Sequence, residues 1–200
     1  MVELTDRFEM ALVYANQLHR GQLRKDGRSP YVAHLLSVAA LVLEDGGSED
    51  EAIAALLHDA VEDQGGLPTR QTIQAKFGDR VVRLIDGCTE SETIPKPPWL
   101  ERKHRYLEQI RQACPAVRRI SLADNLHNAR SLLACLTWEG PSVWNRFSGG
   151  RTQTLWFYRT LLDIYCHSGT DAMTQAFQAV IIQLEALEEV KGERGEGIRG

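Results

Sequence analysis

The stretch AALLHDAVED, residues 54–63, combines an apolar helical pattern with four ionisable side chains. Small and aliphatic residues fill most of its positions, yet His58, Asp59, Glu62 and Asp63 stand among them. A charged group that is buried without a partner costs much free energy, so such groups are normally paired or bound to a metal. The stretch therefore predicts a helix that carries a metal site with an acid/base pair beside it.

Two residues of matching chemistry, His34 and Asp124, lie elsewhere in the chain. A lone histidine is more often a core or capping residue, but the adjacent pair His58 and Asp59 favours a shared site. Two imidazoles with two carboxylates favour Mn, Fe, Co or Zn over calcium, and they leave room for water at a six-coordinate ion. Mn²⁺ fits this set best, with another divalent transition metal as the alternative.

Glu62 lies one helical turn after His58 and Asp59, so its carboxylate shares a helical face with these candidate ligands. Asp63 stands next to it. Acids near a helix C-terminus oppose the helix dipole, which argues against a purely solvated role for the pair. Because a metal lowers the pKa of bound water and a nearby carboxylate can take its proton, Glu62 and Asp63 are candidate catalytic residues.

Basic and polar side chains outside the motif are candidates for binding a substrate. Arg24 and Lys25 lie in a turn-rich loop and could hold phosphate or stack on a base, although charged loops are usually only solvated. Lys96 and Arg151 are candidates for the same role, and they too could be only solvated. Asn128 follows the candidate ligand Asp124 by one turn and could hydrogen-bond a substrate hydroxyl. We expect His127 and Arg130 to be structural and to pair with nearby acids.

The hydrophobic pattern predicts an all-α fold, because no alternating strand pattern exceeds a few residues. We expect one domain over residues 1–190 and a frayed, charged tail over 191–200. Caps and helix breakers predict helices from Thr5 to Gly21, from Pro30 onward, from Ser48 to Gly65, over 69–77 and 79–88, from Trp99 onward, from Pro115 through Leu133, and over 155–165 and 171–190.

The composition bounds the partners and the compartment. The net charge of −4 gives no broad positive field, so we expect no nucleic-acid partner. No apolar run approaches the about 20 residues that span a bilayer, and no secretory signal is visible, so we expect a cytoplasmic protein without a membrane contact. We expect the four cysteines, Cys88, Cys114, Cys135 and Cys166, to be buried reduced thiols. Core packing is expected for Trp138, Trp144, Trp156 and Phe157.

Several short motifs follow one another along residues 8–135. They are HRGQ (19–22) followed by Arg24 and Lys25, PYVAH (30–34), LLHDAVED (56–63), FG (77–78), DGCT (86–89) and LADNLHN (122–128). The order of these motifs resembles that of the HD superfamily of metal-dependent phosphohydrolases. Their amino-acid sequences resemble those of the hydrolase domain of the RelA/SpoT alarmone enzymes. The resemblance implies a stand-alone small alarmone hydrolase, similar to the metazoan SpoT homologue.

The resemblance also implies roles for individual residues. It implies that His34, His58, Asp59 and Asp124 hold Mn²⁺, that Glu62 and Asp63 are the catalytic pair, that Arg24 and Lys25 flank the guanine and phosphates, and that Asn128 contacts the sugar. The implied reaction removes pyrophosphate from the 3′ position of ppGpp or pppGpp and yields GDP or GTP.

Three residues differ from the type that is usual in the family at their positions: Cys88 replaces a Val, and Glu90 and Ser121 each replace a Lys. They lie close to the expected pocket and bear on the choice of substrate, so ppApp, NADPH and dNTPs stay open as alternatives. A non-catalytic HD nucleotide-binding sensor is a further alternative. The intact pair of Glu62 and Asp63 favours an enzyme, because a pure binder needs no water-activating acids.

Overall fold

The computed structural model describes residues 2–91, 95–167 and 171–192, with side chains described up to residue 187. These residues form helices and no β-strand, which confirms the all-α prediction; an isolated bridge joins Leu23 and Pro30. The helices are α1 (Asp6–Leu18), α2 (Tyr31–Glu44), α3 (Glu49–Leu57), α4 (Ala60–Asp63), α5 (Leu67–Phe77), α6 (Asp79–Cys88), α7 (Trp99–Gln112), α8 (Pro115–Glu139), the 3-10 helix η1 (Pro141–Arg146), α9 (Gly150–Cys166) and α10 (Ala172–Gly192).

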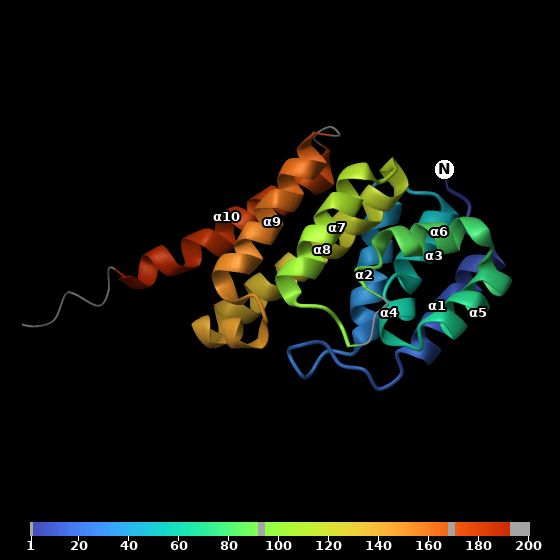
Figure 1. Ribbon diagram of the computed structural model, residues 1–200, viewed down its shortest axis with the longest axis horizontal. Coiled ribbons are helices and arrows are strands. Elements are labelled where there is room, and N and C mark those ends of the chain that lie inside the picture. The colour runs from blue at the N-terminus through green and yellow to red at the C-terminus, as the bar shows by residue number, and fades with distance from the viewer. Residues whose placement is uncertain (1, 92–94, 168–170, 193–200) are drawn as a thin grey trace, which may run out of the picture.

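Helix α3 lies at the centre of the packing. Its residues from Glu51 to Leu57 are all buried, and it contacts α1, α2, α6 and α8. The long helix α8 also packs against α2 and α10, so it joins the two sides of the molecule (Figure 1). Helices α9 and α10 lie on the side of α8 that faces away from α1 and α5 (Figure 1), and α7 contacts α6, α8 and α9. This arrangement brings α2, the end of α3 and α8 together.

The helix predicted from Ser48 to Gly65 is interrupted, so that prediction was wrong in one respect. His58 and Asp59 lie between α3 and α4. The Nδ1–H of His58 donates to the carbonyl of Ala55 at 2.8 Å, on the acceptor that a continuous helix would offer to the amide of Asp59. In an unbroken helix adjacent side chains diverge by about 100°. The interruption lets the neighbouring side chains of His58 and Asp59 reach the same cavity.

Helix α3 begins with a capping box, as its sequence predicts. The Ser48 hydroxyl accepts the amide of Glu51, and the Glu51 carboxylate accepts the amide of Ser48 at 2.9 Å. We expect Ser48→Ala to lower the free energy of unfolding by about 1 kcal/mol. Thermal unfolding should show a lower melting temperature by about 2–4 °C. The exposed, mid-helix Thr72→Ala is the control, and an equal shift in both variants would contradict a capping role.

Other boundaries and burial predictions needed correction. Helix α1 ends at Leu18, before Gly21. Helix α9 begins at Gly150, before the predicted start at residue 155. The sequence did not reveal this earlier start because the first turn of α9 is polar and hides the helical period. Trp138 is 88% exposed in the last turn of α8, while Trp144 and Phe157 are buried. All four cysteines are free, but Cys114 and Cys166 are exposed at helix ends.

Two further expectations concern the tail and the membrane. The expected tail falls largely on residues 193–200, which lie outside the described residues. Among the helices that the structure describes, none combines the length and the apolar character needed to cross a membrane.

Candidate functional site

A cavity of about 580 Å³ opens where α2, the break after α3 and α8 meet. This volume lies in the range typical of small-molecule sites. The cavity is lined by nine of the eleven residues that the sequence indicated: Arg24, Lys25, His34, His58, Asp59, Glu62, Asp63, Asp124 and Asn128. Lys96 and Arg151 are not among its lining residues. The structure thus brings together most of a set that spans more than a hundred residues of sequence.

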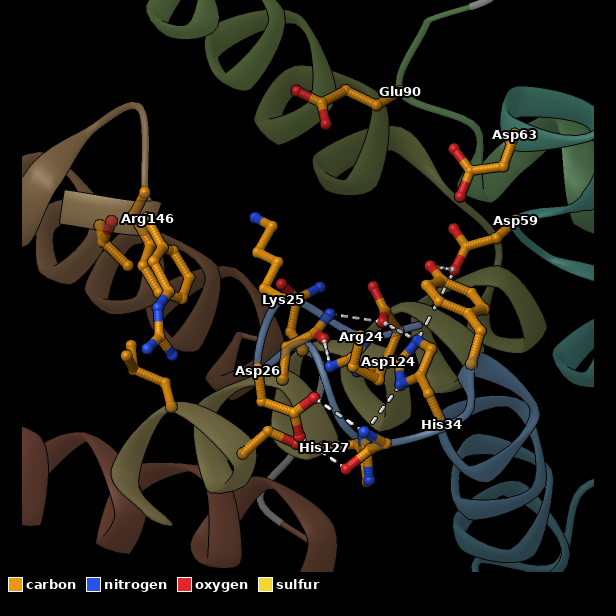
Figure 2. Close-up of a pocket in the computed structure, with 18 of the residues that line it drawn as sticks. Arg24, Lys25, Asp26, His34, Asp59, Asp63, Glu90, Asp124, His127 and Arg146 are labelled. Atoms are coloured by element: carbon orange, nitrogen blue, oxygen red, sulfur yellow. Dashed lines mark hydrogen bonds and ion pairs between the residues drawn. The ribbon is translucent and has the colours of Figure 1, made fainter. Parts of the chain in front are cut away.

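Two imidazoles, those of His34 and His58, and the carboxylates of Asp59 and Asp124 converge at one end of this cavity; Figure 2 labels His34 and the two acids. The Nε2 atom of His34 lies 3.2 Å from Asp124 Oδ1 and 3.6 Å from Asp59 Oδ2. The Nε2 atom of His58 lies 3.0 Å from Asp59 Oδ2 and 3.6 Å from Asp124 Oδ1. Donor atoms of His34, His58 and Asp59 all lie within 4.8 Å of one another. Asp124 is not part of this group of three, but its Oδ1 atom lies close to Nε2 of both histidines.

The charges of this cluster call for a positive partner. Burial opposes ionisation of both acids, yet the two histidines hold the pKa values of Asp59 and Asp124 well below the usual range. Burial also disfavours the charged form of His58, but the two carboxylates outweigh it and raise the pKa of His58 well above its usual value. Two ionised acids beside buried imidazoles are the environment that a divalent cation stabilises.

The orientation of His58 also fits a metal. Its Nδ1–H donates to the carbonyl of Ala55, so Nε2 is the ring nitrogen that faces the carboxylates and that a metal would displace a proton from. This Nε2 atom is buried, and within the described part of the chain it makes no hydrogen bond. An HD-type site with such a donor set indicates a divalent metal.

Two further residues that line the cavity, Tyr31 and His127, support the donors, a role that the sequence did not indicate for them. The hydroxyl of Tyr31 donates to Asp59 Oδ2 at 2.6 Å, and the Tyr31 ring stacks on His19 at 5.0 Å. The Nδ1 atom of His127 lies 2.8 Å from Nδ1 of His34. His127 was expected to pair with acids, so its histidine partner is a correction. Both supporting residues lie three positions from a candidate ligand on the same helix, which is the signal that could have revealed them.

The candidate catalytic acids sit beside this cluster. The Glu62 carboxylate accepts a hydrogen bond from the ammonium of Lys96 at 2.6 Å and another from the backbone amide of Glu90 at 3.2 Å. Asp63 accepts the side-chain amide of Gln22 at 3.1 Å. Asp59 and Asp63 lie on the same side of the cavity in Figure 2. Lys96 therefore reaches the site through Glu62, although it does not line the cavity.

The basic loop reaches the cluster through one amide side chain. A guanidinium N–H of Arg24 donates to Asn128 Oδ1 at 2.7 Å, and Asn128 Nδ2 donates to Asp124 Oδ1 at 2.6 Å. The guanidinium also lies 5.6 Å from the centre of the Tyr31 ring. Arg24 and Asn128 thus adjoin the same end of the cavity as the four donors.

Lys25 supplies a second cation farther from the donors. Its ammonium lies 4.7 Å from the centre of the Phe147 ring and projects into the cavity (Figure 2). Burial, and repulsion by Lys103 and Arg24, lower the pKa of the Lys25 ammonium. An anion that entered the cavity would relieve this repulsion.

Sequence comparison identifies relatives that span most of this region. The HD domain family matches residues 11–154. The chain is 38% identical over 135 residues to the human guanosine-3′,5′-bis(diphosphate) 3′-pyrophosphohydrolase MESH1, a match that covers 66% of this chain and 70% of that protein. A guanosine-3′,5′-bis(diphosphate) 3′-pyrophosphohydrolase of Aquifex aeolicus is 34% identical over 127 residues, which cover 64% of this chain and 18% of that protein.

Solved structures with the same fold include a metazoan ortholog of SpoT described as hydrolysing ppGpp. It aligns with a TM-score of 0.69 and 26% identity over 96% of this chain and 99% of that chain. A protein of Listeria monocytogenes aligns with a TM-score of 0.65 and 31% identity over 78% of this chain and 99% of that chain.

Proposed function

The chain belongs to the HD domain family, and we propose that within it the protein is a metal-dependent (p)ppGpp 3′-pyrophosphohydrolase. The observation that carries the proposal is the convergence of two imidazoles and two carboxylates in a cavity that Glu62 and Asp63 also line. The similarity to enzymes named for this reaction supports it. A sensor without turnover would need the metal donors but not the adjoining acids.

We assign the metal to His34, His58, Asp59 and Asp124, and we propose Mn²⁺ as the ion. The mixed nitrogen and oxygen donor set supports a transition metal over calcium. The Nε2 atoms of the two histidines and an oxygen of each carboxylate would hold the ion. When bound, the metal lowers the pKa of a coordinated water and polarises a phosphoryl oxygen.

Glu62 is assigned as the group that takes a proton from the attacking water. Its carboxylate accepts hydrogen bonds from Lys96 and from the amide of Glu90, and these contacts hold it beside the candidate ligands. Asp63, held by Gln22, is assigned to orient the water. The water oxygen bonds to the phosphorus attached to the 3′ oxygen, the bond to that oxygen breaks, and the 3′ oxygen gains a proton. The products are GDP or GTP and free pyrophosphate.

Arg24, Lys25 and Asn128 are assigned to the nucleotide. The planar guanidinium of Arg24 beside the Tyr31 ring is suited to stack on a purine, and Lys25 offers charge to a phosphate. Asn128 lies between Arg24 and Asp124, where a sugar hydroxyl would find hydrogen-bonding groups. Lys96 could exchange its bond with Glu62 for a bond to a phosphate. Substrate binding by Arg151 stays a prediction, because Arg151 does not line the cavity.

Arg24→Ala should raise KM for ppGpp by roughly tenfold or more, because loss of stacking on a base costs about 1–3 kcal/mol. The expected effect on kcat is smaller, since Arg24 is assigned to binding. Steady-state kinetics measure both constants. Arg83→Ala, which removes an exposed guanidinium from α6, is the matched control. An unchanged KM for the Arg24 variant would contradict the assigned role.

The substrate itself is tested by incubating the protein and Mn²⁺ with ppGpp, ppApp, NADPH and dGTP in parallel. We expect the highest kcat/KM with ppGpp, and we expect GDP and pyrophosphate among the separated products. Higher kcat/KM with NADPH or dGTP than with both alarmones would leave only a metal-dependent phosphohydrolase. Binding of ppGpp without any product would favour the sensor. We expect no nucleic-acid partner and a cytoplasmic location, as the sequence predicts; the oligomeric state is left open.

A further inference from the structure

We propose that His127 is a positioning residue of the metal centre, which accepts a hydrogen bond from Nδ1–H of His34 and thereby aims Nε2 of His34 at the other donors. The inference rests on the proposed metal site but adds a residue to it. His127 also lines the cavity, and the inference assigns its effect on the metal to its hydrogen bond with the ring of His34.

The geometry places His34 between its two sets of partners. Its Nδ1 lies 2.8 Å from Nδ1 of His127, and its Nε2 lies 3.2 Å from Asp124 Oδ1. The two imidazole rings have centroids 4.9 Å apart and planes inclined by 43°. His34 is buried, and its ring also meets the edge of Tyr31 at 5.6 Å. The contact with His127 thus closes off the side of the ring opposite the candidate metal.

Hydrogen counting then fixes the roles of the two nitrogens. Two Nδ1 atoms at 2.8 Å need one hydrogen between them. If that hydrogen came from His127, a neutral His34 would carry its own hydrogen on Nε2 and could not bind a cation there. Metal binding through Nε2 therefore requires the hydrogen on Nδ1 of His34. His127 must then accept through its bare Nδ1.

The same arrangement holds the second histidine of the cluster. Nδ1–H of His58 donates to the carbonyl of Ala55 at 2.8 Å, which leaves Nε2 of His58 for the metal. One imidazole is thus aimed by the backbone and the other by a side chain. Outer hydrogen bonds of this kind are worth about 10–100-fold in metal affinity. His127 lies three residues after Asp124, so one face of α8 supplies a candidate ligand and the group that orients another.

Two substitutions separate the acceptor from the bulk of the ring. His127→Leu keeps an apolar group of similar size without an acceptor, whereas His127→Asn offers an oxygen close to the place of Nδ1. We expect the Kd for Mn²⁺ to rise about 10–100-fold in the leucine variant and only a few-fold in the asparagine variant. Competition with a chelating dye measures Kd, and thermal unfolding of the metal-free proteins checks the fold. Wild-type affinity in the leucine variant, or equal losses in both, would overturn the inference.

A second measurement uses the wild-type protein and holds even if the leucine variant does not fold. With diamagnetic Zn²⁺ added, ¹⁵N NMR of the histidines should show the hydrogen on Nδ1 of His34 and a bare Nδ1 on His127. A hydrogen on Nδ1 of His127 would overturn the inference. Failure of the wild-type protein to bind either Mn²⁺ or Zn²⁺ would instead contradict the proposed metal centre, so the two failures are distinguishable.

Discussion

Asp59→Ala is expected to abolish metal binding and to reduce hydrolysis of ppGpp to background. Asp59 Oδ2 lies 3.0 Å from Nε2 of His58 and 3.6 Å from Nε2 of His34, so its loss removes a donor from the centre of the cluster. It also removes a negative charge that the imidazoles and a cation need as a counterpart. The metal content, measured by elemental analysis after dialysis, should fall from about one ion per chain to near zero.

Asp163→Ala is the control for this result, because Asp163 is an exposed acid of α9 that does not line the cavity. That variant should keep its metal and its activity. If the Asp59 variant retained a full equivalent of metal, the assignment of Asp59 as a ligand would be wrong.

Glu62→Gln should retain metal and nucleotide while kcat falls by about 10²-fold or more, which is the scale of general acid/base catalysis. The amide keeps the size of the carboxylate and can still accept the bond from Lys96, but it cannot take a proton from water. Single-turnover kinetics at saturating ppGpp, together with the Kd for Mn²⁺, separate catalysis from binding.

Glu101→Gln is the matched control for Glu62, because Glu101 is exposed on α7 and pairs with Arg105 one turn away. We expect its kcat to match the wild-type value. A near-normal kcat in the Glu62 variant would reassign Glu62 to a structural role as the partner of Lys96.

Helical periodicity and residue order predicted much of the fold and most of the residues that line the candidate site. The apolar spacing in α8 placed Asp124 and Asn128 on one face, and the structure joins these two side chains by a hydrogen bond. Ser29-Pro30 placed His34 near the start of a helix, where α2 has it. These features depend on local spacing, which a sequence displays directly.

The remaining features depend on contacts between distant segments. The helix break at His58 arises because its side chain takes the Ala55 carbonyl, a choice that apolar spacing does not express. The link of Lys96 to Glu62 and that of His127 to His34 join separate elements across the cavity. The exposure of Trp138 shows the same limit, because the periodic pattern of α8 does not mark where its packing partners end.

Anomalous diffraction at the manganese edge, from crystals grown with Mn²⁺, tests the central claim most directly, since the proposed chemistry depends on the metal. The account predicts one strong anomalous peak within bonding distance of His34 Nε2, His58 Nε2, Asp59 and Asp124. A cavity without a peak, or a peak bound by other residues, would contradict it.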